Sequence, residues 1–315
     1  MSFFKFFSRF KVALVLLLTL LGVASVRSVQ AGQADKLNVV VTTTHLADLA
    51  KDIGGEHVEV TRLMGPGVDP HGYEPTPSDV DAIQKADLVG YNGLHLEAMF
   101  TDIFEKMRAS NDNVFALEDA IADDQILDYK YEDKDLEDDP HIWFDIQLWK
   151  QSAKLVAERF SQADPDNQAD YQANLEVYLK RLDELDAEIK EMVAELDVEK
   201  RILITAHDAF SYFGENYDFR VEGIQGINTQ TEAGTGDVSQ TAKIVLENNV
   251  KAVFIESSVS DRNIKALIEA VEAAGGQLEI GGELFSDALG TEEDNAGDYF
   301  SAYRTNVQTI VNALK

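Results

Sequence analysis

The feature that most constrains this fold is a long stripe of apolar side chains between residues 165 and 196. These side chains recur at spacings of three and four, which places them on one face of a single amphipathic helix. They are Leu175, Leu179, Leu182, Leu185, Ile189, Met192, Val193 and Leu196. A short coiled-coil dimer would use the same stripe, but a helix packed along its own chain is the commoner arrangement. We therefore expect one long helix over 165–196.

Short β-branched runs alternate with helical patterns on both sides of that helix. Before it come "LNVVVTTT", "HVEVTRLM", "ADLVGYNG" and "NVFAL"; after it come "KRILITAHDAF", "FRVEGIQGI", "VKAVFIESS" and "QLEIGGELF". Such alternation predicts an α/β fold with mostly parallel sheets. A chain of 315 residues is long for one core, so we expect two α/β lobes. The predicted lobes are 32–164 and 197–315, joined by the helix over 165–196.

Residues 1–31 have the pattern of a secretory signal peptide. Lys5, Arg9 and Lys11 precede an apolar run over 12–26, and small side chains surround a cleavage point near Ala31. A retained membrane anchor is the alternative, but the apolar run is shorter than the roughly 20 residues that a spanning helix needs. We expect export, cleavage near Ala31 and a periplasmic location.

The composition limits what else the chain can do. It contains no cysteine, so disulfides, thiolate metal ligands and a lipid-modified cysteine at the cleavage point are not expected. Its formal net charge is −30, which repels nucleic acid and anionic membranes. The acidity fits solubility or a saline habitat, and it also fits attraction of cations toward a site; both interpretations stay open.

Four candidate metal ligands lie in loops, three of them after predicted strands, where ligands bind in open α/β domains. They are His71, His141, His207 and Asp287, two from each predicted lobe. Three imidazoles and one carboxylate suit Zn²⁺ and are acceptable to Mn²⁺. Spacing alone does not favour these histidines over His45, His57 and His95, which fit core, surface or capping positions equally well.

Four sequence motifs, which follow one another after the export signal, distinguish the candidate ligands from the other histidines. The segments "DPHGYEPTPSDV", "DPHIWFD", "TAHDAFSYFGENY" and "GGELFSDALG" resemble the metal-binding solute receptors of ABC transporters, the cluster A-I family of TroA-like, zinc-uptake and manganese-uptake receptors. The resemblance covers almost the whole mature chain. It implies two lobes bridged by one long helix, one metal ion between them, and the ligands His71, His141, His207 and Asp287.

The same resemblance leaves the metal open between Zn²⁺ and Mn²⁺. Manganese receptors of the family often have glutamate at the position of His207, whereas zinc receptors often lack a carboxylate at the position of Asp287. This chain resembles the TroA-like pattern of three histidines and one aspartate. Zinc receptors also often carry a His-rich loop before the second motif; the matching segment here, 123–139, is acidic and has no histidine.

The loop around His71 is stiffened by four prolines, Pro66, Pro70, Pro75 and Pro77. Prolines remove backbone freedom before the metal arrives, so less entropy is lost on binding. Alternatively they only turn the chain and start a helix, whose predicted N-cap is Thr76 or Ser78. Four further side chains either orient the imidazoles or cap local structure: Asp69, Tyr73, Asp145 and Asp208.

The sequence thus predicts a monomeric, non-enzymatic receptor that captures Zn²⁺ or Mn²⁺ and delivers it to an ABC transporter permease. An exported zinc-dependent hydrolase is the main alternative, because three histidines and a water also describe a catalytic centre. Against it, Asp287 fills the fourth position, no HExxH motif is present and the ligands come from both lobes. A receptor for a chelated metal is neither indicated nor excluded.

Overall fold

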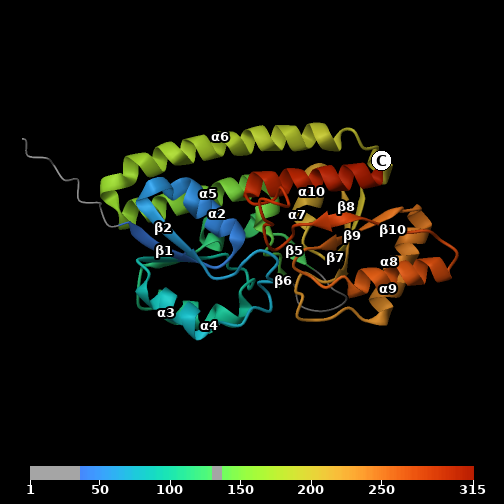
Figure 1. Cartoon of the computed structure of the whole chain (residues 1–315), viewed down its shortest axis with the longest axis horizontal. Helices are drawn as coiled ribbons and strands as arrows, with labels where there is room; N and C mark the ends of the chain where they lie inside the picture. The colour runs from blue at the N-terminus through green and yellow to red at the C-terminus, as the bar shows by residue number, and fades with distance from the viewer. Residues whose placement is uncertain (1–35, 130–136) are drawn as a thin grey trace, which may run out of the picture. The chain divides into compact units, whose positions relative to one another are not determined.

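The computed structural model describes residues 36–129 and 137–315 (Figure 1). The predicted signal peptide and the middle of the acidic segment lie outside the described residues. The first sheet is entirely parallel, with strand order β2-β1-β3-β4. Its strands are β1 (Leu37–Val41), β2 (Val58–Arg62), β3 (Leu88–Tyr91) and β4 (Val114–Ala116). The carboxyl ends of these strands therefore meet at one edge.

Three helices connect these strands: α2 (Thr44–Gly54), α3 (Pro77–Lys85) and α4 (Thr101–Arg108). Helix α3 begins as the sequence predicts. The Thr76 hydroxyl accepts the backbone N–H of Asp79, the Asp79 carboxylate accepts the N–H of Thr76, and Pro77 occupies the first turn. Such reciprocal capping satisfies backbone donors that have no partner within a helix, so the end of the proline-rich loop is fixed.

The second half of the chain repeats the pattern with parallel strand pairs. β7 (Ile202–His207) pairs with β8 (Arg220–Gln225), β9 (Ala252–Glu256) pairs with β10 (Glu279–Leu284), and β7 lies beside β9. The connecting helices are α7 (Ser211–Tyr217), α8 (Thr235–Asn248) and α9 (Arg262–Ala273). A short antiparallel pair, β5 (Asp128–Tyr129) and β6 (Glu137–Asp138), lies between the two halves of the sequence.

The long helix is present as α6 (Gln168–Val193). It is shorter than the predicted 165–196 because Pro165–Asn167 form a 3₁₀ turn before it. Its buried face contains most of the predicted stripe, with Leu182, Leu185 and Ile189 completely enclosed. Short 3₁₀ turns also occur at Gly55–His57, Ala98–Phe100, Leu117–Ala120, Asp123–Gln125, Ile142–Phe144 and Val198–Lys200.

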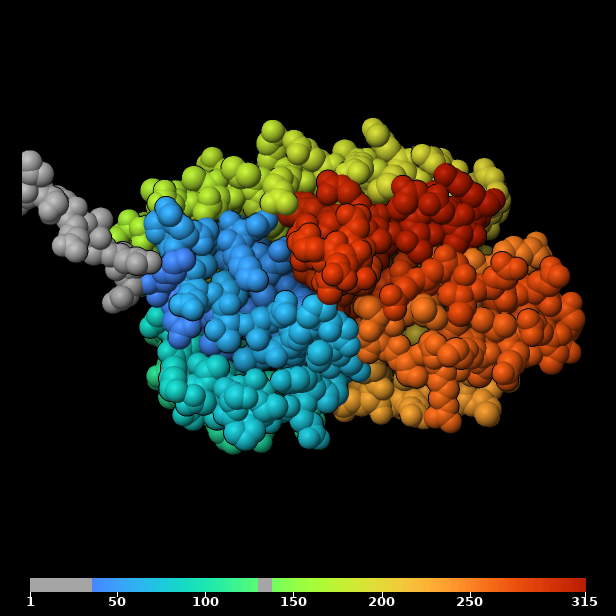
Figure 2. All heavy atoms as spheres, in the orientation of Figure 1, coloured from blue at the N-terminus to red at the C-terminus, as the bar shows by residue number. Residues whose placement is uncertain are grey.

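Helices of the same chain cover the apolar stripe of α6. They are α2, α5 (Ile146–Ala163) and α10 (Tyr299–Leu314), all in contact with α6. No helix is predicted from the sequence over 146–163 or 299–314, and the structure corrects this. Figure 2 shows the surface of α10 between those of α6 and the chain's early residues. The stripe is thus used inside the chain, as a packed helix and not as a free coiled-coil seam.

One hydrophobic core runs through both halves of the described chain. Its buried members come from β1, α2, α5, α6, β7 and α10. Arg181 of α6 joins three of these helices: its guanidinium lies 2.6 Å from the Asp52 carboxylate of α2 and 3.8 Å from the ring centre of Phe300 of α10.

Among the described residues, no helix has the length and apolar character to cross a membrane. The predicted fold class, two α/β lobes with parallel sheets and one long linking helix, is confirmed.

Candidate metal centre

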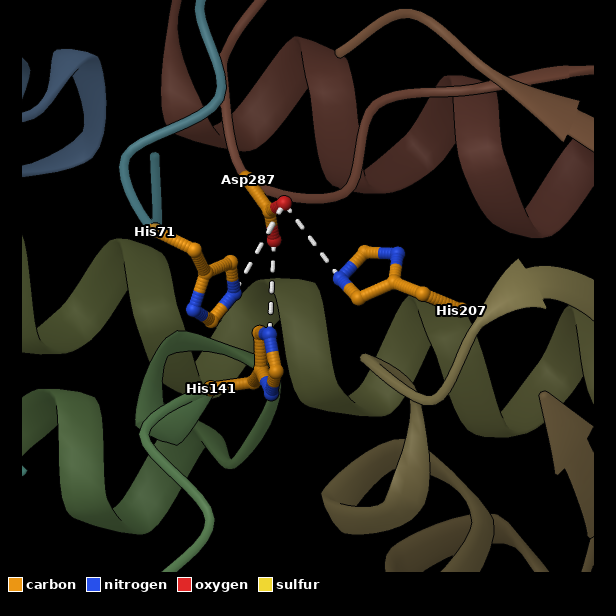
Figure 3. A group of neighbouring side chains, drawn as sticks. All are labelled: His71, His141, His207 and Asp287. Atoms are coloured by element: carbon orange, nitrogen blue, oxygen red, sulfur yellow. Dashed lines mark ion pairs between the residues drawn. The ribbon is translucent and has the colours of Figure 1, made fainter. Parts of the chain in front are cut away.

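Four buried side chains point toward one another where the loops of the two halves meet (Figure 3). His71, His141, His207 and Asp287 each offer one ligand atom, and these atoms all lie within 4.8 Å of one another. The Nε2 atoms of His207 and His141 lie 3.3 Å and 3.4 Å from the Asp287 carboxylate, and Nε2 of His71 lies 4.0 Å from it. The structure thus brings together all four residues that the sequence singles out.

Each side chain stands where a strand or loop ends. His207 is the last residue of β7, and Asp287 follows β10. His71 lies in the proline-rich loop between β2 and α3, and His141 directly precedes the 3₁₀ turn that leads into α5. Convergence of such loops is the expected location of a binding site in open α/β sheets.

Two of the separations from the Asp287 carboxylate are close to those around a tetrahedral ion, and the four ligand atoms all lie within 4.8 Å of one another. Bonds of about 2.05 Å from zinc to nitrogen or oxygen place neighbouring ligand atoms about 3.3 Å apart in a tetrahedron. His141 and His207 already stand at that separation from Asp287, and His71 lies slightly farther out. These separations exceed those of charge-assisted hydrogen bonds, which are about 2.7–2.9 Å long.

The ligand atoms are buried without hydrogen-bond partners in the described part of the chain. This holds for Nε2 of His71, His141 and His207 and for both carboxylate oxygens of Asp287. All four side chains are at most 2% exposed. Unpartnered polar atoms in a protein interior cost about 1–3 kcal/mol each, and their convergence at one point is an arrangement that a bound cation could satisfy.

Two carboxylates that the sequence analysis does not name hold two of the imidazoles from behind. Asp139 Oδ1 lies 2.6 Å from Nδ1 of His141 and also accepts the backbone N–H of that histidine. Glu256, at the end of β9, lies 2.6 Å from Nδ1 of His207 and accepts its backbone N–H. A carboxylate on Nδ1 fixes the tautomer and leaves Nε2 free to bind a metal.

Burial and the neighbouring carboxylates together shift the pKa values of the four candidate ligands. Burial opposes a charge on His141, but Asp139 and Asp287 outweigh it and raise the pKa to about 9. Burial likewise opposes charge on His207, yet Asp287 and Glu256 raise its pKa well above the ordinary value. For His71, burial dominates and lowers the pKa to about 3. Burial alone would favour neutral Asp287, but His207 and His141 hold its pKa well below the usual range.

The other histidines lie elsewhere. His45 is buried and stacks on Trp143, with ring centres 4.8 Å apart, and burial lowers its pKa to about 3. His57 pairs with Asp170 of α6 at 2.9 Å. His95 is exposed, with a left-handed backbone (φ 60°). None of the three belongs to the group of four.

The four further candidates divide between the two roles. Asp69 accepts the backbone N–H of His71 at 2.9 Å, so it positions that residue. Asp145 caps α5, Asp208 accepts the Ser211 hydroxyl, and Tyr73 donates to Asp79. These three contacts are local.

Fold and site together define a class: an α/β protein whose strand-end loops surround a buried group that could hold one metal ion. Residues 39–313 match the family model described as zinc-uptake complex component A, periplasmic. The chain belongs to this family.

Two curated relatives and one solved structure show the same likeness. The zinc-binding protein TroA of Treponema pallidum is 42% identical over 282 residues, and the manganese-binding lipoprotein MntA of Bacillus subtilis is 40% identical over 280. Each alignment covers 89% of this chain and 90% of the relative. The solved periplasmic zinc binding protein TroA matches with a TM-score of 0.84, covering 89% of this chain and 99% of the other.

Proposed function

We propose that this chain is an exported receptor that binds one Zn²⁺ or Mn²⁺ at His71, His141, His207 and Asp287 and delivers it to the membrane permease of an ABC transporter. The membership of the family and the names of the relatives, one zinc-binding and one manganese-binding, support the substrate class. Other relatives, SloC of Streptococcus mutans among them, are named as metal ABC transporter substrate-binding lipoproteins, which supports the partner.

One observation carries the metal site. Five buried donor atoms, three imidazole nitrogens and two carboxylate oxygens, converge without hydrogen-bond partners among the described residues. Asp139 and Glu256 behind them orient the imidazoles and make them better donors. A divalent cation would satisfy every one of these atoms at once, which no single hydrogen-bonding group could do.

The geometry favours a receptor over a zinc hydrolase. Catalytic zinc sites keep three protein ligands and leave one position for water or substrate. Here four side chains already surround the position proposed for the ion, so all four positions of a tetrahedral shell could be filled with one oxygen of Asp287 and no water. Glu256, the buried carboxylate nearest to His207, faces Nδ1 and not the side where a zinc-bound water would lie.

We further propose that the two lobes span 32–164 and 197–315, as predicted from the sequence, so that each lobe supplies two ligands. We also propose that the signal peptide is cleaved near Ala31 and that the mature protein is a free monomer in the periplasm. The relatives MntA and SloC are named lipoproteins. This sequence has no cysteine to carry a thioether-linked lipid, which supports release from the membrane after export.

Metal titration of single variants tests the site. His71→Ala, His141→Ala and Asp287→Ala should each weaken Zn²⁺ binding by at least tenfold, because each removes a ligand. His57→Ala is the matched control, since His57 pairs with Asp170 on the surface of α6 and should leave affinity unchanged. Wild-type protein should bind one ion per chain in calorimetry. Two equally tight sites, or a His71→Ala variant that binds like wild type, would refute the assignment.

A further inference from the structure

His71 is held differently from the other two histidines of the site. Asp139 supports the ring of His141 from its own loop, and Glu256 supports the ring of His207 from the neighbouring strand β9. Within residues 36–129 and 137–315, the one carboxylate that lies within 4 Å of a ring nitrogen of His71 is Asp287. The distance from His71 to Asp287 is also longer than the distances from His141 and His207 to Asp287. The position of His71 therefore depends on its backbone.

The backbone of His71 is held from the other half of the chain. Its N–H donates to Asp69 Oδ1, and the second oxygen of that carboxylate accepts the Thr229 hydroxyl at 2.6 Å. The carbonyl of His71 accepts a hydrogen bond from the side-chain amide of Gln230. Thr229 and Gln230 are about 160 residues away in sequence, in the loop that follows β8. Both polar groups of the His71 backbone thus connect to this loop.

The loop itself is fixed to the second half of the chain. Gln225, buried at the end of β8, donates its side-chain amide to the carbonyls of Thr229 and Thr231 at 3.4 Å and 3.1 Å. Its side-chain oxygen accepts from Asn263 of α9 at 3.2 Å. The loop is therefore a firm support, and a displacement of β8 and α9 would be passed to His71.

A cavity of about 350 Å³ lies beside this contact. His71 lines it from one half of the chain, and Ile227 and Asn228 line it from the loop after β8. Of the four candidate ligands, His71 alone lines this cavity, although it is only 2% exposed, whereas His141 and His207 are completely enclosed. The last bond to form on capture, and the first to break on release, is expected on this side.

We propose that Thr229 and Gln230 are positioning residues for His71: they form a latch between the two halves of the chain that completes the metal shell when closed and sets the rate of metal release. This inference rests on the proposed metal site. The Thr229 hydroxyl acts through Asp69 on the N–H of His71, and Gln230 acts directly on its carbonyl. Loss of either contact frees His71 to move toward the cavity and away from Asp287.

Zn²⁺ dissociation kinetics with a chelator as the trap test the latch. Thr229→Val keeps the shape of the side chain and removes the hydroxyl, so dissociation should be at least about tenfold faster, since hydrogen bonds to charged groups are strong. Thr229→Ser keeps the hydroxyl and should stay within about twofold of wild type. Thr231→Val is the matched control, because Thr231 uses its carbonyl and not its side chain. The melting temperature of metal-free Thr229→Ser and Thr231→Val should match that of wild type, and metal-free Thr229→Val should still unfold in one cooperative transition.

A second variant guards against a misfolded Thr229→Val protein. Gln230 is exposed, so Gln230→Leu should fold normally while it loses the bond to the His71 carbonyl. It should also release Zn²⁺ faster with one ion bound per chain. If Thr229→Val and Gln230→Leu both release Zn²⁺ at the wild-type rate, or if Thr231→Val accelerates release equally, the latch is wrong. If wild-type protein binds no Zn²⁺, or if His71→Ala binds it as tightly as wild type, the metal site itself is wrong.

Discussion

Glu256 holds His207 at two points: its carboxylate accepts the backbone N–H at 2.9 Å and lies 2.6 Å from ring Nδ1. Both residues are completely or almost completely buried, and they come from adjacent strands, β9 and β7. The position of β9 beside β7 therefore decides which nitrogen of His207 faces Asp287. Asp139 holds His141 in the same two ways from two residues upstream.

We expect Glu256→Gln to weaken Zn²⁺ affinity by about tenfold to a hundredfold, the usual cost of losing a carboxylate behind a metal-binding histidine. The amide keeps the volume but removes the charge that makes imidazole a strong donor. Glu279→Gln, an exposed position on β10, is the matched control. Competition with a fluorescent zinc chelator gives the dissociation constants. Equal affinity for Glu256→Gln and Glu279→Gln would show that Glu256 does not tune the site.

Metal binding should release protons at neutral pH. Neighbouring carboxylates raise the pKa of His141 to about 9 and also raise the pKa of His207, so we expect His141 to carry a proton at pH 7 before a metal binds. A metal binds only the neutral imidazole, so at least one proton should leave per ion. Calorimetry in two buffers of different ionisation enthalpy counts them. Heats that do not depend on the buffer would contradict the raised pKa values.

The sign of the pH dependence follows from the same shifts. Because the pKa of His141 is raised, affinity should keep increasing from pH 5 through 7 and up to about 9, well beyond the ordinary histidine pKa of about 6.5. In metal-free protein these protons stabilise the fold below pH 6.5, and that contribution is lost as the pH rises toward 9. Titrations at five pH values would check this. An affinity that levels off near pH 6.5 would disagree with it.

His207→Glu should narrow the ratio of Zn²⁺ to Mn²⁺ affinity. It replaces a nitrogen ligand by a hard anionic oxygen, which suits Mn²⁺ better. Zn²⁺ should still bind more tightly, since the Irving–Williams order favours it. His207→Ala, in contrast, should weaken both ions through loss of a ligand. Competitive titration at fixed pH measures the ratio. If the ratio is unmoved in His207→Glu, the selectivity argument fails although the site stands.

Metal removal should lower the stability of the fold. Ligands from distant parts of the chain meet only in the native state, so binding energy adds to folding energy. At a free Zn²⁺ concentration of 1,000 times the dissociation constant, the gain should be about 4 kcal/mol. Thermal unfolding with Zn²⁺ and with EDTA compares the two states. In a variant lacking His71, the difference in melting temperature between Zn²⁺ and EDTA should be much smaller. If the wild-type melting temperature is the same with Zn²⁺ and with EDTA, the proposed site is wrong.

Local sequence determined most elements of the fold. The β-branched runs became the parallel strands, and Thr76 capped α3, because these signals act over a few neighbouring residues. Helices α5 and α10 escaped the sequence analysis, although they pack along α6. The apolar stripe of α6 predicted that other elements must cover this face of the helix. It did not predict which elements cover it, since any amphipathic partner satisfies the same pattern.

The candidate ligands were selected by four motifs that resemble those of a known receptor family, because position after a strand alone did not separate them from the other histidines. The residues that support them divide by distance. Asp139 lies two positions before His141, as Asp69 lies two positions before His71. The short spacing could therefore have predicted from the sequence that Asp139 supports His141. Glu256 and Thr229 have no such signal. Their partners, His207 and Asp69, are far away in the chain and are reached only because β9 lies beside β7 and because two distant loops meet. The sequence thus predicted which side chains meet at the candidate metal site, whereas the tertiary structure alone decided which groups orient them, because such contacts depend on distance in space and not along the chain.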